Sequence, residues 1–128
     1  MGTEIRENLK YTENHEWLKV KGNSAVVGIT DHAQSELTDI VYVELPEIGK
    51  EIKKGAEICV VESVKSVSEI FAPISGKVIN INKKLEDSPE SINKSPYDDG
   101  WLIELEITDR SEINSLLDPE AYKKIIEG

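Results

Sequence analysis

The sequence around the bond between Lys65 and Ser66 reads almost the same in both directions. Two antiparallel strands that leave a tight turn produce such a pattern, because residues opposite each other share one face of the sheet and need similar chemistry. Lys65 is therefore expected at the tip of a hairpin, where solvent and other proteins can reach it. The mirror predicts these cross-strand pairs: Val64 with Val67, Ser63 with Ser68, Glu62 with Glu69, Val61 with Ile70, Val60 with Phe71, Gly55 with Gly76, Lys54 with Lys77, and Ile52 with Ile79.

The predicted turn, residues 64–67, is compatible with a hairpin but does not require one. It lacks the Asn-Gly or Asp-Gly pair that marks a two-residue primed turn, although a type I turn accepts ordinary residues. Lysine is also frequent in this chain, with thirteen copies, and most turn lysines are simply solvated. From the residues alone, Lys65 is either an ordinary turn residue or an amine presented for the attachment of another group.

The chain has the length of one domain and a strongly acidic composition. Its 128 residues include 25 acidic and 15 basic side chains, for a formal net charge of −10. Such a surface repels phosphate backbones and anionic lipid, so we expect no nucleic acid and no membrane as a partner, but proteins with basic docking faces. Cys59 is the single cysteine, which excludes an intramolecular disulfide. The N-terminal residues form no apolar signal core, so we expect either a cytoplasmic location or a mature form whose targeting segment is missing.

Alternating apolar residues predict a chain made mostly of strands, with a short helix after Ile29. Asp31 is expected to cap this helix, Gln34 lies three residues on, and the helix should end near Leu37. Ser88-Pro89 predicts a short helical turn with the proline at its first position. The strands are expected over residues 17–21, 25–29, 40–45, the two arms of the Lys65 hairpin, 76–81 and 101–107.

Two helices are expected to close the chain at its C-terminus. Asp109 with Glu112 should begin the first, and Asp118 with Pro119 the second. No helix in the middle of the chain is long enough for repeated crossovers, so the sheets should be antiparallel. The predicted fold is mainly β, a flattened antiparallel barrel-sandwich hybrid. It forms a single domain over residues 1–128, with the hairpin at 55–76 and a C-terminal helical cap at about 109–127.

Residue patterns of catalytic and metal sites are scarce in this sequence. Two histidines and one cysteine are too few and too scattered for a structural zinc site, and no glycine-rich phosphate loop or Gly-x-Ser-x-Gly turn occurs. Cys59 lies in an apolar run and is expected to be buried. His15-Glu16 and Asp31-His32 each place an imidazole beside a carboxylate, but most such neighbours are surface or capping residues. We therefore predict no enzyme and no metal site.

Several motifs resemble the H-protein family of the glycine cleavage system, in the order that the family has them. Residues 62–66 and 72–78 are similar to the family's lipoyl-lysine region, which includes a lysine at the position of Lys65. Further resemblance covers most of the chain from about residue 9 to 126. It includes residues 11–12 with 15–17, residues 28–34, residues 41–46 with Gly49, and Asn93 with residues 95–97 and 100–102.

The resemblance implies a lipoyl- or biotinyl-carrier-like fold and a covalent cofactor, lipoate, joined through an amide bond to Lys65. In the family the carrier moves an aminomethyl group and reducing equivalents between three enzymes, and the chemistry belongs to the cofactor. These enzymes are glycine decarboxylase, aminomethyltransferase and dihydrolipoamide dehydrogenase, and a lipoate ligase or a lipoyl/octanoyl transferase installs the arm. A carrier that serves several enzymes is simplest as a monomer without catalytic activity of its own.

The resemblance also assigns roles to the carboxylates near Lys65. Glu62 and Glu69 flank the lysine and are expected to help the modifying enzyme recognise it. In the family the loaded arm folds back onto the protein, and Glu16, Glu69 and His32 match the candidates for a pocket that receives its ammonium-like end. Gly55 and Gly76 are expected to serve the backbone at tight bends.

The sequence departs from the family pattern at a few positions and leaves other carriers open. Thr38 stands where the family usually has glycine after the short helix, which puts the backbone path there in doubt. Ser66 replaces a commonly small apolar residue. Biotin carriers resemble one another in having methionine on both sides of the modified lysine. Val64 and Ser66 occupy these positions here, which disfavours that class. An H-like protein that relays lipoate to other complexes remains an alternative, and a small hydrolase using His15 or His32 is a weaker one.

Overall fold

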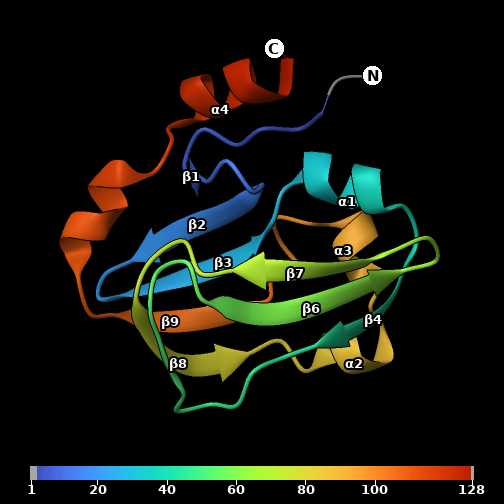
Figure 1. The fold of residues 1–128 in the computed structure, drawn as a ribbon, viewed down its shortest axis with the longest axis horizontal. Coiled ribbons are helices and arrows are strands. Elements are labelled where there is room, and N and C mark those ends of the chain that lie inside the picture. The colour runs from blue at the N-terminus through green and yellow to red at the C-terminus, as the bar shows by residue number, and fades with distance from the viewer. Residues whose placement is uncertain (1–2, 128) are drawn as a thin grey trace.

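Within residues 3–127, which the computed structural model describes, the chain forms two antiparallel sheets (Figure 1). The expected domain of residues 1–128 thus has its two ends, residues 1–2 and 128, outside the described part. The six-stranded sheet has the order β1 (Lys10–Tyr11), β2 (Glu16–Lys21), β3 (Ser24–Ile29), β9 (Ile103–Ile107), β8 (Gly76–Ile81) and β5 (Glu51–Ile52). The three-stranded sheet has the order β4 (Ile40–Glu44), β6 (Glu57–Ser63) and β7 (Val67–Phe71).

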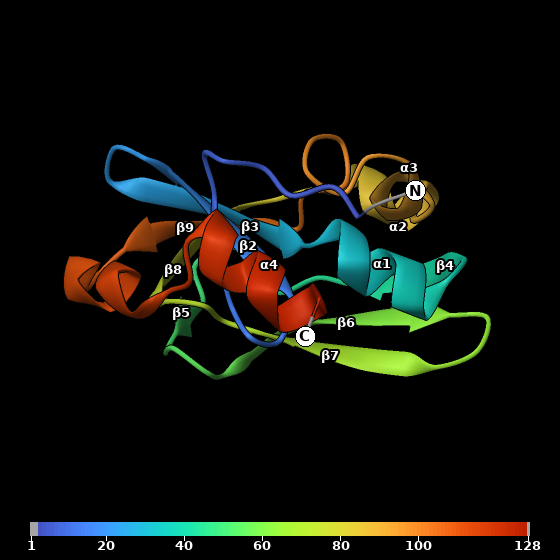
Figure 2. The ribbon, with the colours of Figure 1, turned by 90° about the horizontal axis from the view of Figure 1, so that it is seen from above.

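The two sheets form two layers, and the apolar faces between them make the main core (Figure 2). Val27, Val78 and Leu105 of the larger sheet and Val61 of the smaller one are all fully buried there. In β9, for example, the buried Ile103 and Leu105 alternate with Glu104 and Glu106, as a sheet with one solvated face requires. The predicted mainly β, antiparallel sandwich hybrid is confirmed, and in both views the β6–β7 hairpin turns at the edge of the molecule.

The helix predicted after Ile29 is present as α1 (Asp31–Leu37), but its cap is one residue earlier than expected. The Thr30 hydroxyl accepts the N–H of Ala33 at 3.2 Å, while Asp31 accepts a side-chain hydrogen bond from Gln34 at 2.8 Å. Thr30 and Asp31 are both good capping residues, so the sequence alone did not decide between them. Two further short helices, α2 (Lys84–Asp87) and α3 (Ser91–Lys94), lie on either side of a turn that contains Pro89. The proline therefore precedes α3 and is not its first residue.

The C-terminal elements begin where the sequence predicted. The first is a 3-10 helix, η1 (Arg110–Ser115), in which Asp109 accepts the N–H of Ser111 at 3.0 Å. The second is α4 (Pro119–Glu127), and Asp118 accepts the N–H of Ala121 at 2.8 Å. Glu112 does not complete a capping box, because its carboxylate accepts hydrogen bonds from the backbone and hydroxyl of Ser75.

A second apolar cluster joins the C-terminal helix to the first strands. The rings of Tyr11 and Tyr122 are stacked with centroids 4.5 Å apart, and both side chains are fully buried. Trp17 is buried beside them and donates its indole N–H to the carbonyl of Pro96 at 3.0 Å. Strand β1, which the sequence did not predict, is short, and its Tyr11 also pairs with Leu117. This cluster fixes α4 over β1, next to the strand that carries Glu16.

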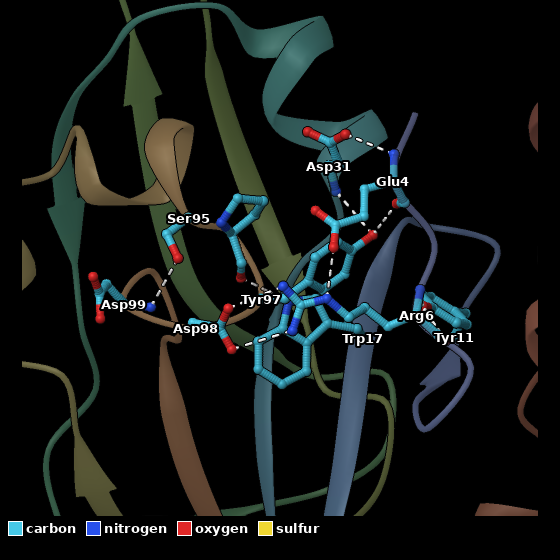
Figure 3. A network of polar contacts seen from close by, with 10 residues as sticks. Glu4, Arg6, Tyr11, Trp17, Asp31, Ser95, Tyr97, Asp98 and Asp99 are labelled. Carbon is cyan, nitrogen blue, oxygen red and sulfur yellow. Dashed lines mark hydrogen bonds and ion pairs between the residues drawn. The ribbon is translucent and has the colours of Figure 1, made fainter. Parts of the chain in front are cut away.

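The segment before β1 is held over Trp17 by polar contacts (Figure 3). Arg6 makes two hydrogen bonds to Asp98, at 2.9 and 3.2 Å, and its guanidinium lies over the ring of Tyr97. The backbone of Glu4 donates to Asp31 at 2.8 Å and accepts from the Tyr97 hydroxyl at 2.6 Å. These bonds tie the N-terminal segment to α1 and to the loop before β9.

The Lys65 hairpin is present, but its register differs from the mirror by two residues. The observed partners are Glu62 with Val67, Val61 with Ser68, Val60 with Glu69, and Cys59 with Ile70, so the centre is the bond between Val64 and Lys65. Because side chains alternate with a period of two, this shift leaves each residue on the face that the mirror assigned. The outer pairs were wrong, since Ile52 and Glu51 pair with Gly76 and Lys77 in the other sheet.

Thr38, which stands where the resembled family has glycine, occupies a backbone conformation that favours glycine. It ends α1 with φ 64° and ψ −147°, and its N–H bonds to the carbonyl of Gln34. A β-branched residue rarely adopts positive φ. The connection to β4 thus keeps a glycine-like path despite the threonine, at a cost in backbone strain.

Candidate functional site

Lys65 lies at the exposed tip of the hairpin, in a two-residue loop with Val64. The Ser63 N–H donates to the Ser66 carbonyl at 2.8 Å and closes the loop. The Ser63 hydroxyl accepts the N–H groups of Lys65 and Ser66 at 3.3 and 3.1 Å, and a hydroxyl that bonds its own turn in this way stabilises the turn. Val64 donates to the carbonyl of Asp39 at 3.0 Å, which ties the tip to the start of β4. The backbone under Lys65 is therefore held in place.

The side chain of Lys65, by contrast, is free. Among residues 3–127, no ion pair and no side-chain hydrogen bond engages its amine. A fixed backbone with an unengaged, exposed amine presents one reactive group at a defined place, which is the arrangement that an attachment site needs.

Glu62 and Glu69 lie on the outward face of the small sheet, in different rows. Glu62 is half-buried opposite Val67, and Glu69 is exposed opposite Val60. Glu69 also lies close to Glu57, and this neighbouring carboxyl raises the pKa of Glu57. The two carboxylates that flank Lys65 in the sequence are thus near the tip but do not face each other.

A depression of about 160 Å³ lies beside β7 and contains Glu69. Ile29, Leu37 and Ile70 give it apolar walls, and His15 and Glu36 line it together with Glu69. Apolar walls with two carboxylates suit an aliphatic chain that ends in a cation.

His32 does not line this depression itself, but it lies beside two residues that do, His15 and Glu36. Its ring lies against that of His15, with centroids 4.6 Å apart, and its Nε2 lies 3.6 Å from Glu36. Burial and the nearby His32 lower the pKa of His15, whose Nδ1 is hydrogen-bonded to the Tyr122 hydroxyl at 2.9 Å. The structure therefore brings together Glu69, Glu36 and the two histidines.

Glu16 lies in an adjacent depression of about 300 Å³, and Asn14 lines both depressions. Glu16 is 2% exposed, and its carboxylate accepts hydrogen bonds from the Thr12 hydroxyl and, at 3.3 Å, from the N–H of Phe71. Burial raises the pKa of Glu16, and the two hydrogen bonds oppose this rise. Glu16 thus accepts the Phe71 N–H at the free edge of β7. It does not share one pocket with Glu69 and His32.

Substitution of Glu16 separates its structural contribution from its charge. Because burial favours the protonated form, the stability that Glu16 contributes is present at low pH and is lost as the pH rises through its raised pKa. Glu16→Gln should remove this dependence and be at least as stable as the parent at pH 7. Glu16→Ala leaves the Phe71 N–H without its acceptor and should cost about 1–3 kcal/mol. Urea unfolding of the three proteins between pH 4 and 8 measures both effects, and equal pH profiles for parent and Glu16→Gln would contradict the burial argument.

Three residues of the depressions were missed in the sequence. Glu36 and Asn14 carry no motif; α1 brings Glu36 to Glu69, and the segment before β2 brings Asn14 there. His15 was considered as a neighbour of Glu16, within a family-like motif and as a hydrolase candidate, but not as a pocket residue, although it lines the depression. Amphipathic spacing from His32 to Glu36, four residues on a helix, was the one signal that could have linked Glu36 to the site.

Other chemistry-bearing groups do not form a second centre in the described part of the chain. Cys59 is buried as predicted, and burial raises the pKa of its thiol to about 12. Within residues 3–127, no group of three or more His, Cys, Asp or Glu side chains is arranged to hold a metal ion. None of the helices described is long and apolar enough to cross a membrane.

The fold and the site together define a carrier domain: a two-layer antiparallel hybrid that presents one free lysine on a hairpin tip. The sequence model of the family described as Glycine cleavage H-protein matches residues 9–128. Glycine cleavage system H proteins of Anaeromyxobacter sp. (strain K) and Anaeromyxobacter dehalogenans are each 55% identical over 124 residues, 97% of either chain. The chain belongs to the glycine cleavage H-protein family.

A solved structure supports the same relationship. A glycine cleavage system H protein from Mycobacterium marinum superposes with a TM-score of 0.89 at 34% identity, covering 97% of this chain and 100% of that one. The shared fold includes both sheets, so the arrangement described above is that of the family.

Proposed function

We propose that this protein is the lipoyl-lysine carrier of a glycine cleavage system, with lipoate joined by an amide bond to Lys65. The observation that carries this proposal is the unengaged amine of Lys65 at the exposed tip of a fixed hairpin, in a chain that belongs to the H-protein family. Lipoate bound there would supply a dithiolane that takes up an aminomethyl group and reducing equivalents.

Lys65 and its surroundings fit such an attachment. Conversion of the amine to a neutral amide removes one positive charge, and within residues 3–127 no carboxylate is paired with that charge. The group would extend into solvent from a turn whose backbone bonds are already satisfied by Ser63 and Asp39. Attachment therefore disturbs neither the core nor the sheet.

We further propose that Glu69 and Glu36 line the resting place of the cationic end of the arm, with His32 and Glu16 nearby. A carboxylate at the end of an apolar depression attracts an ammonium-like group and keeps water from one side of it. Support comes from the depression beside β7, which combines the carboxylates of Glu36 and Glu69 with apolar walls. Glu62 would contribute by marking the lysine for the modifying enzyme.

In this proposal the protein is a substrate and not a catalyst. Glycine decarboxylase, aminomethyltransferase and dihydrolipoamide dehydrogenase would act on the arm in turn, after a lipoate ligase or a lipoyl/octanoyl transferase has installed it. Tethering raises the concentration of the arm at each docked active site without adding affinity. A monomer in the cytoplasm suits this role.

Mass spectrometry of protein produced together with a lipoate ligase and lipoate tests the proposal. We expect one lipoyl increment on the intact protein, located on the peptide that contains Lys65. The other twelve lysines serve as internal controls, because they offer the ligase the same amine without the hairpin. A biotin increment, an increment on another lysine, or no increment under these conditions would overturn the proposal.

A further inference from the structure

Exposed apolar side chains are concentrated around Lys65. Among residues 3–127, eight large apolar side chains are exposed, and four of them lie at the hairpin tip or on the neighbouring edge strand. We call these four residues the tip surface: Val41, Tyr42, Val64 and Val67, which are 53%, 49%, 66% and 63% exposed. Solvent-exposed apolar residues are common singly, but a group beside a reactive residue indicates contact with another protein.

A β-bulge in β4 creates half of the tip surface. The pairing of β4 with β6 shifts between Ile40 and Tyr42, so Val41 is an extra residue without a partner. In a regular strand one of two consecutive side chains would face the core, whereas here both Val41 and Tyr42 are exposed. Bulges re-aim side chains and are frequent next to functional sites.

The ladder places the tip surface on one side of the small sheet. Tyr42 pairs with Glu62, and Glu62 pairs with Val67, so these three side chains form one row across the outward face. Val64 lies in the loop that joins β6 to β7, and its N–H bonds to the carbonyl of Asp39 just before β4. Lys65 therefore projects from an apolar surface with a carboxylate at its centre.

The charged residues on the strands around the tip surface are all acidic. Strands β4, β6 and β7 contain no lysine or arginine, and they carry four glutamates: Glu44, Glu57, Glu62 and Glu69. Lys65 lies in the loop between β6 and β7. A complementary partner would offer an apolar hollow with a basic rim.

We infer that the tip surface is the docking site of the enzyme that acylates Lys65, an inference that rests on the proposed lipoyl attachment. In that reaction the lysine amine attacks the carbonyl carbon of lipoyl-adenylate, which forms from lipoate and ATP with release of pyrophosphate. The new amide bond replaces the bond to the phosphate, and AMP and a proton leave. The amine must reach this carbonyl carbon, so the enzyme must contact the surface from which Lys65 projects. Enzymes that act on the far end of the arm need not contact it.

Kinetics of acylation test this docking site. The variant Tyr42→Thr/Val67→Thr removes two apolar side chains and keeps the preference for strand structure. The matched control, Val20→Thr/Ile79→Thr, changes two exposed apolar residues on strands of the other sheet. Lipoyl incorporation by a purified lipoate ligase with ATP is followed by intact mass at increasing concentrations of each apo protein. We expect the KM for the tip variant to rise about tenfold or more, with kcat nearly unchanged, and the control to match the parent within about twofold.

Thermal unfolding of both variants establishes that they are folded, and Val41→Thr provides a second variant if Tyr42→Thr is not. Unchanged KM for the folded tip variants would overturn the inference, whereas a parent that is not acylated at Lys65 would overturn the proposed function instead. A further arm identifies the partner: each variant is acylated to completion and then reduced by dihydrolipoamide dehydrogenase. Equal reduction rates for the parent and the variants support the inference. A fall in the reduction rate as large as the fall in acylation efficiency would assign the tip surface to the arm-processing enzymes.

Discussion

Lys65→Arg is expected to receive no lipoyl group under conditions that fully modify the parent protein. Arginine keeps the length and charge of the side chain, but its guanidinium stays protonated and does not act as an acyl acceptor. Because the Lys65 side chain is exposed and has no partner within residues 3–127, the substitution should change the free energy of unfolding by less than about 0.5 kcal/mol. Intact mass after incubation with ligase, ATP and lipoate measures the first effect, and urea unfolding measures the second.

Lys77→Arg is the matched control, because Lys77 is an exposed lysine on β8 and outside the tip. It should be acylated at the parent rate. In a reconstituted glycine cleavage assay, Lys65→Arg should give no glycine-dependent reduction of NAD, while Lys77→Arg should retain the activity. Full acylation of Lys65→Arg would show that another residue is the acceptor and would remove the basis of the proposed function.

The exposure of Lys65 could be predicted from the sequence, but the hairpin register could not. A palindromic run of alternating residues satisfies two registers that differ by two, since both keep the same side chains on the inner face. The choice is made by the turn, where Ser63 accepts hydrogen bonds from Lys65 and Ser66 and closes a two-residue loop. Serine-to-backbone bonds of this kind depend on geometry that the residue pattern does not specify.

The candidate pocket was predicted only in part, for a similar reason. Glu69, Glu16 and His32 are separated widely in the sequence, and strand order decides which of them meet. The free edge of β7 takes the Glu16 carboxylate at Phe71, while α1 brings His32 and Glu36 toward Glu69. Two adjacent depressions result where the resemblance suggested one. The bulge at Val41 could not be predicted either, because the residue pattern from Ile40 to Leu45 is that of a regular strand.

The mirror treated Gly55 and Gly76 as equivalent, and the structure gives them different reasons to be glycine. Gly55 has φ +87°, with open space where a Cβ would be. Gly76 has ordinary φ, but a Cβ there would lie 2.5 Å from the carbonyl oxygen of Glu106 and 3.0 Å from the Cβ of Leu105. Gly76 is buried at the junction of β5, β8 and β9, where Ile52 and Ile107 are its cross-strand partners.

Gly76→Ala is therefore expected to destabilise the protein strongly, by about 3 kcal/mol, the upper end of the usual cost of overpacking. The contact at 2.5 Å is with backbone, which moves only if the β8–β9 ladder is disturbed. This loss should lower the melting temperature by roughly 10 °C. Urea and thermal unfolding, followed by the fluorescence of the buried Trp17, measure both quantities.

Gly55 supplies the control that separates crowding from backbone conformation. Gly55→Ala meets no neighbour and should cost about 1–2 kcal/mol through its positive φ alone. Gly55→Asn should recover part of that loss, because asparagine tolerates positive φ, whereas Gly76→Ser should be no better than Gly76→Ala, since any Cβ meets Glu106. Equal losses for Gly76→Ala and Gly55→Ala, or rescue of Gly76 by serine, would show that the close approach of β8 to β9 is not what requires glycine at residue 76.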